Sequence, residues 1–66
     1  MNEIKNTSVR HLLAGDVLAG SGFTVTRTPY SQVRTPKGRL VVEGNYPGSP
    51  VKAHVWNAST TVAVVA

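Results

Sequence analysis

Short segments in which hydrophobic and polar residues alternate make up most of this chain. Valine, threonine and aromatic residues dominate these segments, while six glycines and four prolines fall between them. A period of two is typical of β-strands with one buried face, and turn residues at intervals of about 8–12 positions are typical of small antiparallel barrels and sandwiches. The pattern predicts five or six short strands, over residues 16–19, 23–28, 30–35, 40–46, 51–57 and 60–65.

The segment 8–13 carries the only signal for a helix. Ser8 could cap a single helical turn there, and Gly15 would end it. Three apolar residues of the segment would face inward, although the same segment also suits a strand: Val9, Leu12 and Leu13.

The segment 51–57 combines two alternating sets of residues that would face opposite sides of a sheet. The apolar set is expected to face the core, which leaves the other set outside as a partner-binding or base-stacking surface. Trp56 has a second interpretation, because an indole in so small a protein contributes most when a twist of the strand buries it. The apolar set is Val51, Ala53 and Val55, and the other set is Lys52, His54 and Trp56.

The sequence Leu12-Leu13-Ala14-Gly15-Asp16-Val17-Leu18 resembles the Leu-x-x-Gly-Asp-x-hydrophobic entry turn that is common in SH3-like barrels, including those of translation-factor and KOW type. The resemblance implies that Gly15 adopts unusual backbone angles, that Asp16 caps the turn, and that a strand begins immediately afterwards. The glycine pattern of the KOW segment itself is not present. A very short, basic β protein of this style also resembles accessory proteins encoded by bacteriophages.

The length of 66 residues fits one small domain, over residues 8–66, preceded by a flexible polar tail over residues 1–7. So small a core contributes only about 3–5 kcal/mol net, and the chain has no cysteine for disulfides or a thiolate zinc site. We therefore expect a barrel of five or six strands that closes its edges, of the SH3-like type that the resemblance implies, or a homo-oligomer that shares them. No apolar run approaches the about 18 residues of a membrane span, and no secretory signal is visible, so a cytoplasmic protein without membrane contact is expected.

The net charge of +4 is concentrated in one part of the sequence. Four of the seven basic residues lie within the segment 27–39, which contains no acidic residue, and Tyr30 lies among them. Arginine side chains bind phosphate groups and an aromatic ring offers a face on which a base can stack. The alternative is a solvated hairpin whose charges only keep the protein soluble. The predicted nucleic-acid-binding residues are Arg27, Tyr30, Arg34, Lys37 and Arg39.

Catalytic and metal sites find little support in the sequence. Asp16 is expected to cap a turn and Glu43 to lie exposed on a strand, and no nucleophile motif surrounds a serine. Two histidines without cysteine give no recognisable metal spacing. We therefore predict a binding module that is not an enzyme and carries no metal or other cofactor.

Three kinds of partner remain open. The first is nucleic acid, DNA or RNA, bound mainly through phosphate by the basic segment 27–39. The second is a protein partner, such as the target of a phage-type inhibitor or a second copy of the chain, with Trp56 and Tyr46 as anchors. The third is a small anionic nucleotide held by the same arginines in an oligomer cleft.

Overall fold

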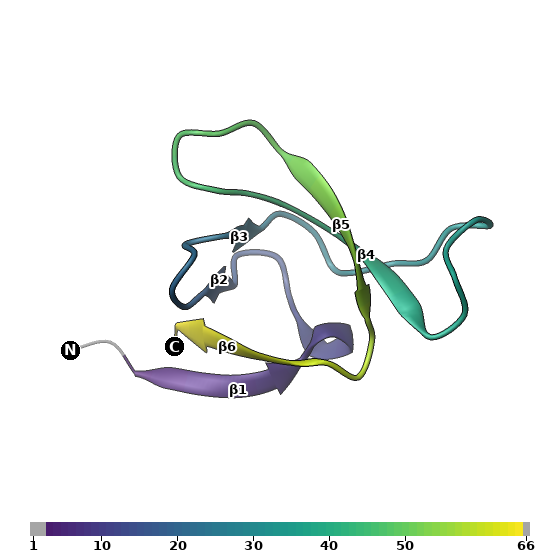
Figure 1. Ribbon diagram of the computed structural model, residues 1–66. Coiled ribbons are helices and arrows are strands. Elements are labelled where there is room, and N and C mark those ends of the chain that lie inside the picture. Colours follow the sequence, from purple (N-terminus) through teal and green to yellow (C-terminus); the bar gives the residue numbers. More distant parts are fainter. Residues whose placement is uncertain (1–2, 66) are drawn as a thin grey trace.

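The chain forms one antiparallel β-sheet. The computed structural model describes residues 3–65, which contain six strands and no α-helix (Figure 1). The order across the sheet is β1-β6-β2-β3-β4-β5, so that β1 and β5 lie at its two open edges. The prediction of an all-β antiparallel fold is therefore confirmed. The strands are β1 (Ile4–Ser8), β2 (Val17–Leu18), β3 (Thr24–Val25), β4 (Arg39–Asn45), β5 (Lys52–Asn57) and β6 (Thr61–Val65).

The N-terminal segment differs from the expected flexible tail. Residues Ile4–Ser8 form β1, which pairs with β6 along its whole length, from Ile4 opposite Val65 to Ser8 opposite Thr61. The apolar strand β6 would otherwise leave one side of its backbone unpaired, so even a polar segment gains hydrogen bonds by covering it. Residues 1, 2 and 66 of the expected tail and domain lie outside the described residues.

A single turn of 3-10 helix follows β1, where the sequence suggested a helical turn. It is η1 (Val9–His11), in which Val9 is fully buried. Ser8 occupies the position before it without making a side-chain capping bond. Leu12 is buried as expected, whereas Leu13 is 61% exposed because the chain turns away from the core at this point.

The turn into β2 has the geometry expected from its sequence. Gly15 has a φ of 97°, in the left-handed region that favours glycine. The carboxylate of Asp16 accepts a hydrogen bond of 2.9 Å from the backbone N–H of Leu13, and β2 begins at the next residue. Asp16 therefore acts as a turn cap.

The chain after β3 pairs less regularly than the predicted strands 23–28 and 30–35. Strand β3 is only two residues long, and the chain then bulges away until Tyr30 forms an isolated bridge with Val41 of β4. Pro29 has no N–H to donate, which interrupts the ladder just before that bridge. The residues beyond Tyr30 form a loop with a turn in which the N–H of Thr35 donates to the carbonyl of Gln32. The segment 30–35 is therefore not a strand.

The faces of β5 are the reverse of the main expectation. Val51 and Val55 are 57% and 45% exposed, whereas Trp56 packs against the core. The register explains this, because His54 lies opposite Val42 of β4, which is fully buried, and both point to the same side of the sheet. Burying the rings removes more apolar surface from water than burying alanine and valine. The core consists of Val9, Leu12, Leu18, Phe23, Val25, Val42 and Val64.

Candidate functional site

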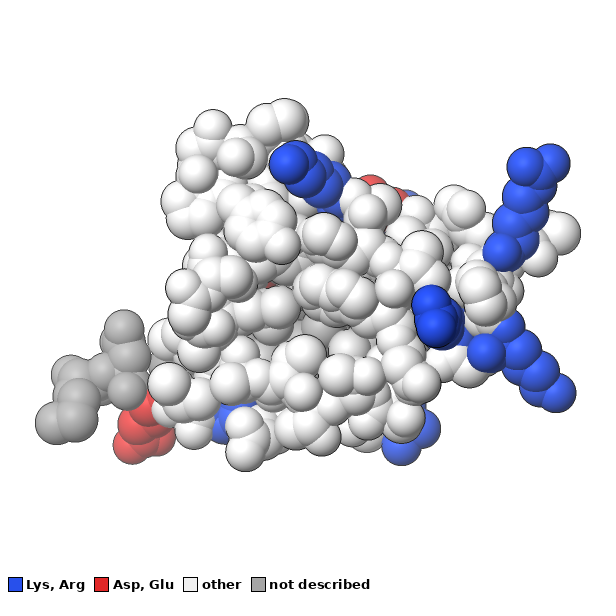
Figure 2. Space-filling view, viewed as in Figure 1, with Lys and Arg blue, Asp and Glu red and all other residues white. Residues whose placement is uncertain are grey.

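The loop between β3 and β4, residues 26–38, carries the basic segment. In Figure 1 this loop extends away from the sheet at the end opposite the start of β1. Figure 2 shows Lys and Arg side chains gathered at that end of the molecule, with no acidic side chain visible among them in this view. The expected concentration of positive charge is therefore also a concentration in space.

Arg27 and Tyr30 form a cluster with an acidic residue from β4. The guanidinium of Arg27 lies 4.1 Å from the ring centroid of Tyr30, and its Nη1 lies 3.5 Å from Oε2 of Glu43. The hydroxyl of Tyr30 donates a hydrogen bond to the same carboxylate. This bond, together with desolvation and the negative charge of Glu43, raises the pKa of Tyr30 above 10.0 against the opposing effect of Arg27. One face of the Tyr30 ring and one charge of the basic segment are thus already occupied.

The other three basic residues of the segment remain exposed. Arg34 and Lys37 lie in the loop, and Arg39 is the first residue of β4. The pair of Arg27 and Glu43 is the only salt bridge within residues 3–65, so these three side chains have no acidic partner there. The structure therefore divides the predicted nucleic-acid-binding residues into a paired set, Arg27 and Tyr30, and an unpaired set, Arg34, Lys37 and Arg39.

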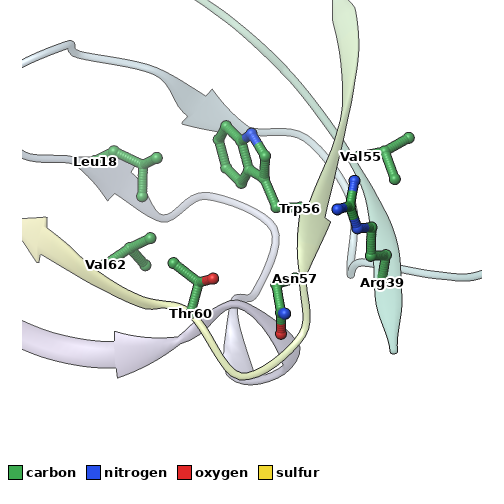
Figure 3. Close-up of a pocket in the computed structure, with 7 residues that line it drawn as sticks. All are labelled: Leu18, Arg39, Val55, Trp56, Asn57, Thr60 and Val62. Atoms are coloured by element: carbon green, nitrogen blue, oxygen red, sulfur yellow. The ribbon is translucent and has the colours of Figure 1, made fainter. Parts of the chain in front are cut away.

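A pocket of about 420 Å³ lies beside the basic loop (Figure 3). It forms where a short turn joins β5 to β6 although the two strands are not neighbours in the sheet. Arg39 belongs both to this pocket and to the unpaired basic set, so the two features are continuous. The pocket is lined by Leu18, Arg39, Val55, Trp56, Asn57, Thr60 and Val62.

The indole of Trp56 belongs to an aromatic cluster centred on Phe23. The ring of Phe23 is fully buried and lies 4.9 Å from Tyr46, 5.2 Å from His54 and 5.7 Å from Trp56, between ring centroids. The imidazole of His54 stacks on the indole, with centroids 5.0 Å apart and planes within 9° of parallel. Nε2 of His54 is also 3.2 Å from the hydroxyl of Tyr46.

The predicted outer set of β5 is therefore split by the structure. Lys52 is exposed, while His54 and Trp56 are half-buried in the aromatic cluster. Tyr46, expected as an anchor for a protein partner, is also half-buried and packs on the core. The pocket was not expected from sequence reasoning, because it depends on the placement of β6 next to β2. In the sequence, the only local indication of the pocket is that Trp56 lies shortly before a turn and another strand.

Among residues 3–65, no three His, Asp or Glu side chains converge closely enough to hold a metal ion. Within the same residues, no helix has the length and apolar character required to cross a membrane.

Comparison with known proteins gives no relatives: no family model, no curated protein and no solved structure matches this chain.

Proposed function

We propose that this protein binds nucleic acid, with the unpaired basic set of Arg34, Lys37 and Arg39 contacting the phosphate backbone. The observation that carries the proposal is the presence of these three exposed cations, without acidic partners in residues 3–65, at one end of the molecule. Phosphate contacts of this kind release counterions and give most of the affinity of non-specific nucleic-acid binding. The protein would then discriminate poorly between sequences.

Arg27 and Tyr30 have a supporting role in this proposal. Their cluster with Glu43, together with the bridge from Tyr30 to Val41, attaches the base of the loop to β4. A loop fixed at its base loses less conformational entropy when its other side chains bind a ligand. We therefore assign direct phosphate contacts to the unpaired basic set and not to Arg27.

We also propose that the sheet curves into an SH3-like barrel. The consecutive strands β2, β3, β4 and β5 are neighbours in order, and β6 returns to pair with β2. A short turn connects β5, at one edge of the sheet, to β6, which lies next to the strand at the other edge. The sheet therefore curves, as the ribbon in Figure 1 illustrates. This curvature supports a barrel-like arrangement with the pocket at its gap.

A salt titration tests the proposed function. Fluorescence anisotropy of a labelled single-stranded oligonucleotide, measured at low and at physiological salt, should show binding that weakens steeply as salt rises. Three phosphate contacts on a single strand correspond to a slope of log K against log salt of about −2. Absence of binding to DNA and RNA at low salt would overturn the proposal.

A second candidate function is docking of a protein strand on the edge of β5. It is favoured by the outer edge of β5, which pairs with no other strand of residues 3–65, and by the exposure of Val51 and Val55 beside it. A second copy of the chain could use the same edge and produce a homo-oligomer. Sedimentation analysis separates this candidate from the first, because strand docking between copies depends on protein concentration and survives moderate salt.

A further inference from the structure

We infer that the pocket between β5 and β6 receives one unstacked base of a single-stranded nucleic acid, while Arg39 binds an adjoining phosphate. This inference rests on the proposed function and adds the class of ligand, a single strand instead of a duplex. It follows from three properties of the pocket: its aromatic wall, its apolar interior and its single charge.

The aromatic wall is the indole of Trp56. The imidazole of His54 already covers one side of this ring. The pocket lining includes Asn57 and Thr60, which follow Trp56 in the chain, but not His54. Figure 3 shows the indole beside the open space, and a base in the pocket would use the face of the ring that His54 leaves uncovered. A base in the pocket would continue the stack that His54 begins, which is how single-strand-binding proteins use aromatic side chains.

The interior of the pocket suits a flat, largely apolar group. Leu18 and Val62 line it opposite the indole (Figure 3), and its volume of about 420 Å³ is within the range of small-molecule sites. Polar groups lie at one side only. The side-chain oxygen of Asn57 accepts two hydrogen bonds from Ser59, which leaves its amide N–H groups as donors for the edge of a base.

The charge of the pocket selects an anionic ligand. Among residues 3–65, Arg39 is the only charged residue that lines it, and no side-chain carboxylate of these residues takes part. Because Arg39 also begins β4 at the end of the basic loop, a strand whose base fills the pocket would continue past Lys37 and Arg34. An acidic peptide could pair with Arg39 alone. A nucleic-acid strand would place a base in the pocket and its phosphates on the basic residues of the loop at the same time.

A duplex cannot use this pocket in the same way. Its bases are paired and stacked, and removing one from the helix costs a few kcal/mol. The pocket therefore predicts a preference for single strands, whereas the basic loop alone predicts binding to any phosphate backbone.

The test uses the single tryptophan of the chain, so that intrinsic emission reports on the pocket alone. Three labelled probes are compared at low salt: a short oligothymidylate, an abasic strand of the same length, and a duplex. We expect the oligothymidylate to quench Trp56 and to bind at least about fivefold more tightly than the abasic strand, the lower limit for stacking of one base. The abasic strand should bind without quenching.

A matched pair of variants locates the effect. Thr60→Phe adds a ring at the pocket rim, whereas Thr61→Phe adds the same ring at an exposed neighbouring residue that does not line the pocket. We expect Thr60→Phe to abolish the preference for oligothymidylate over the abasic strand and Thr61→Phe to retain it. Thermal melts followed by circular dichroism identify any variant that fails to fold, and the comparison of probes with the unmodified chain needs no variant.

The outcomes separate the two proposals. Equal, salt-sensitive affinity for the abasic and thymidylate strands, with unchanged tryptophan emission, would overturn the base pocket and leave the proposed function intact. Failure of every strand to bind at low salt would overturn both. Quenching by an acidic peptide but by no oligonucleotide would show that the pocket serves a protein partner.

Discussion

The ring of Phe23 lies directly against the backbone of Gly44 on the neighbouring strand. A Cβ atom at position 44 would lie 2.6 Å from Cζ of this ring and would also collide with the carbonyl oxygen of Thr24. Gly44 pairs with Val25 and is in extended conformation, so the close approach of the Thr24 carbonyl oxygen and of the Phe23 ring, and not an unusual backbone angle, requires glycine here. The whole aromatic cluster depends on this approach, because Phe23 contacts Tyr46, His54 and Trp56.

Gly44→Ala should therefore destabilise the protein by about 3 kcal/mol, at the upper end of the cost of overpacking. A loss of this size approaches the whole net stability of a domain this small. Urea unfolding measures the free energy, and near-ultraviolet circular dichroism should show that the aromatic cluster has rearranged. Gly48→Ala is the control, because its φ of 75° carries a backbone cost but nothing lies within 4 Å of the added Cβ. A near-ultraviolet spectrum of Gly44→Ala equal to that of the unmodified protein would contradict the prediction.

The orientation of β5, with Val55 facing outward, predicts that two isosteric substitutions have different effects on stability. Val42→Thr places a hydroxyl in a fully buried position and should cost about 1–3 kcal/mol, because burial removes the hydroxyl from water. Val55→Thr places the same group at a position that is 45% exposed and should change the stability by no more than about 0.5 kcal/mol. Chemical denaturation of both variants gives the comparison. Equal costs would mean that Val55 faces the core after all.

The cluster of Tyr30 and Glu43 predicts a dependence of stability on alkaline pH. The pKa of Tyr30 is raised above its ordinary value of 10.0 in the folded protein. At a pH between 10.0 and the pKa of the folded state, Tyr30 is therefore deprotonated in the unfolded chain and still protonated in the folded chain. The unfolding free energy should therefore fall as pH rises above about 10, and this part of the fall should be absent in Tyr30→Phe. Denaturation at several alkaline pH values measures it.

An absorbance titration of tyrosinate provides an independent check of the same cluster. The difference between the unmodified protein and Tyr30→Phe isolates the ionisation of Tyr30. Glu43→Gln should move the pKa of Tyr30 back toward 10.0, because it removes the hydrogen bond from the Tyr30 hydroxyl to a carboxylate and also the negative charge that disfavours the phenolate. No movement would show that Glu43 is not the cause.

The division of the basic residues predicts unequal effects of charge removal on nucleic-acid binding. The double variant Arg34→Gln, Lys37→Gln should weaken binding at low salt and reduce the magnitude of the salt slope by about 1.4, the contribution of two contacts to a single strand. Lys5→Gln removes an exposed charge on β1, at the far side of the sheet from the loop, and is the control. Anisotropy titrations over a range of salt concentrations compare the variants. If Lys5→Gln reduced the salt slope as much, per charge removed, as the double variant does, net charge alone would govern binding.

Much of the strand pattern could be predicted from local signals. The segments 40–46, 51–57 and 60–65 correspond within one residue at each end to β4, β5 and β6, because alternation and the turn residues between them (Pro and Gly before β5, Asn and Ser before β6) are encoded locally. Pairing between distant segments could not be predicted in this way. The residues of β1 show no alternation that marks them as a strand, and only the presence of β6 beside them makes pairing favourable.

The difference between local signals and long-range pairing also explains which parts of the site could be predicted. The basic loop was visible as an acid-free segment, but Glu43 is remote in sequence and reaches Arg27 and Tyr30 only because Tyr30 bridges to β4. The faces of β5 were ambiguous because either alternating set could be buried. The register with Val42 decides the matter, and this register is a property of the sheet and not of the strand.

The pairing of Ile4 with Val65 has a practical consequence for experiments on this protein. The start of β1 and the end of β6 lie side by side, at the end of the molecule away from the β3–β4 loop (Figure 1). A tether attached near either end, whether a surface linker, a fluorophore or a second folded domain, would therefore leave from the same side and keep the loop and its pocket accessible. A short peptide that joins the two ends could also produce a circular permutant reopened within the loop, a rearrangement that domains with adjacent ends commonly tolerate.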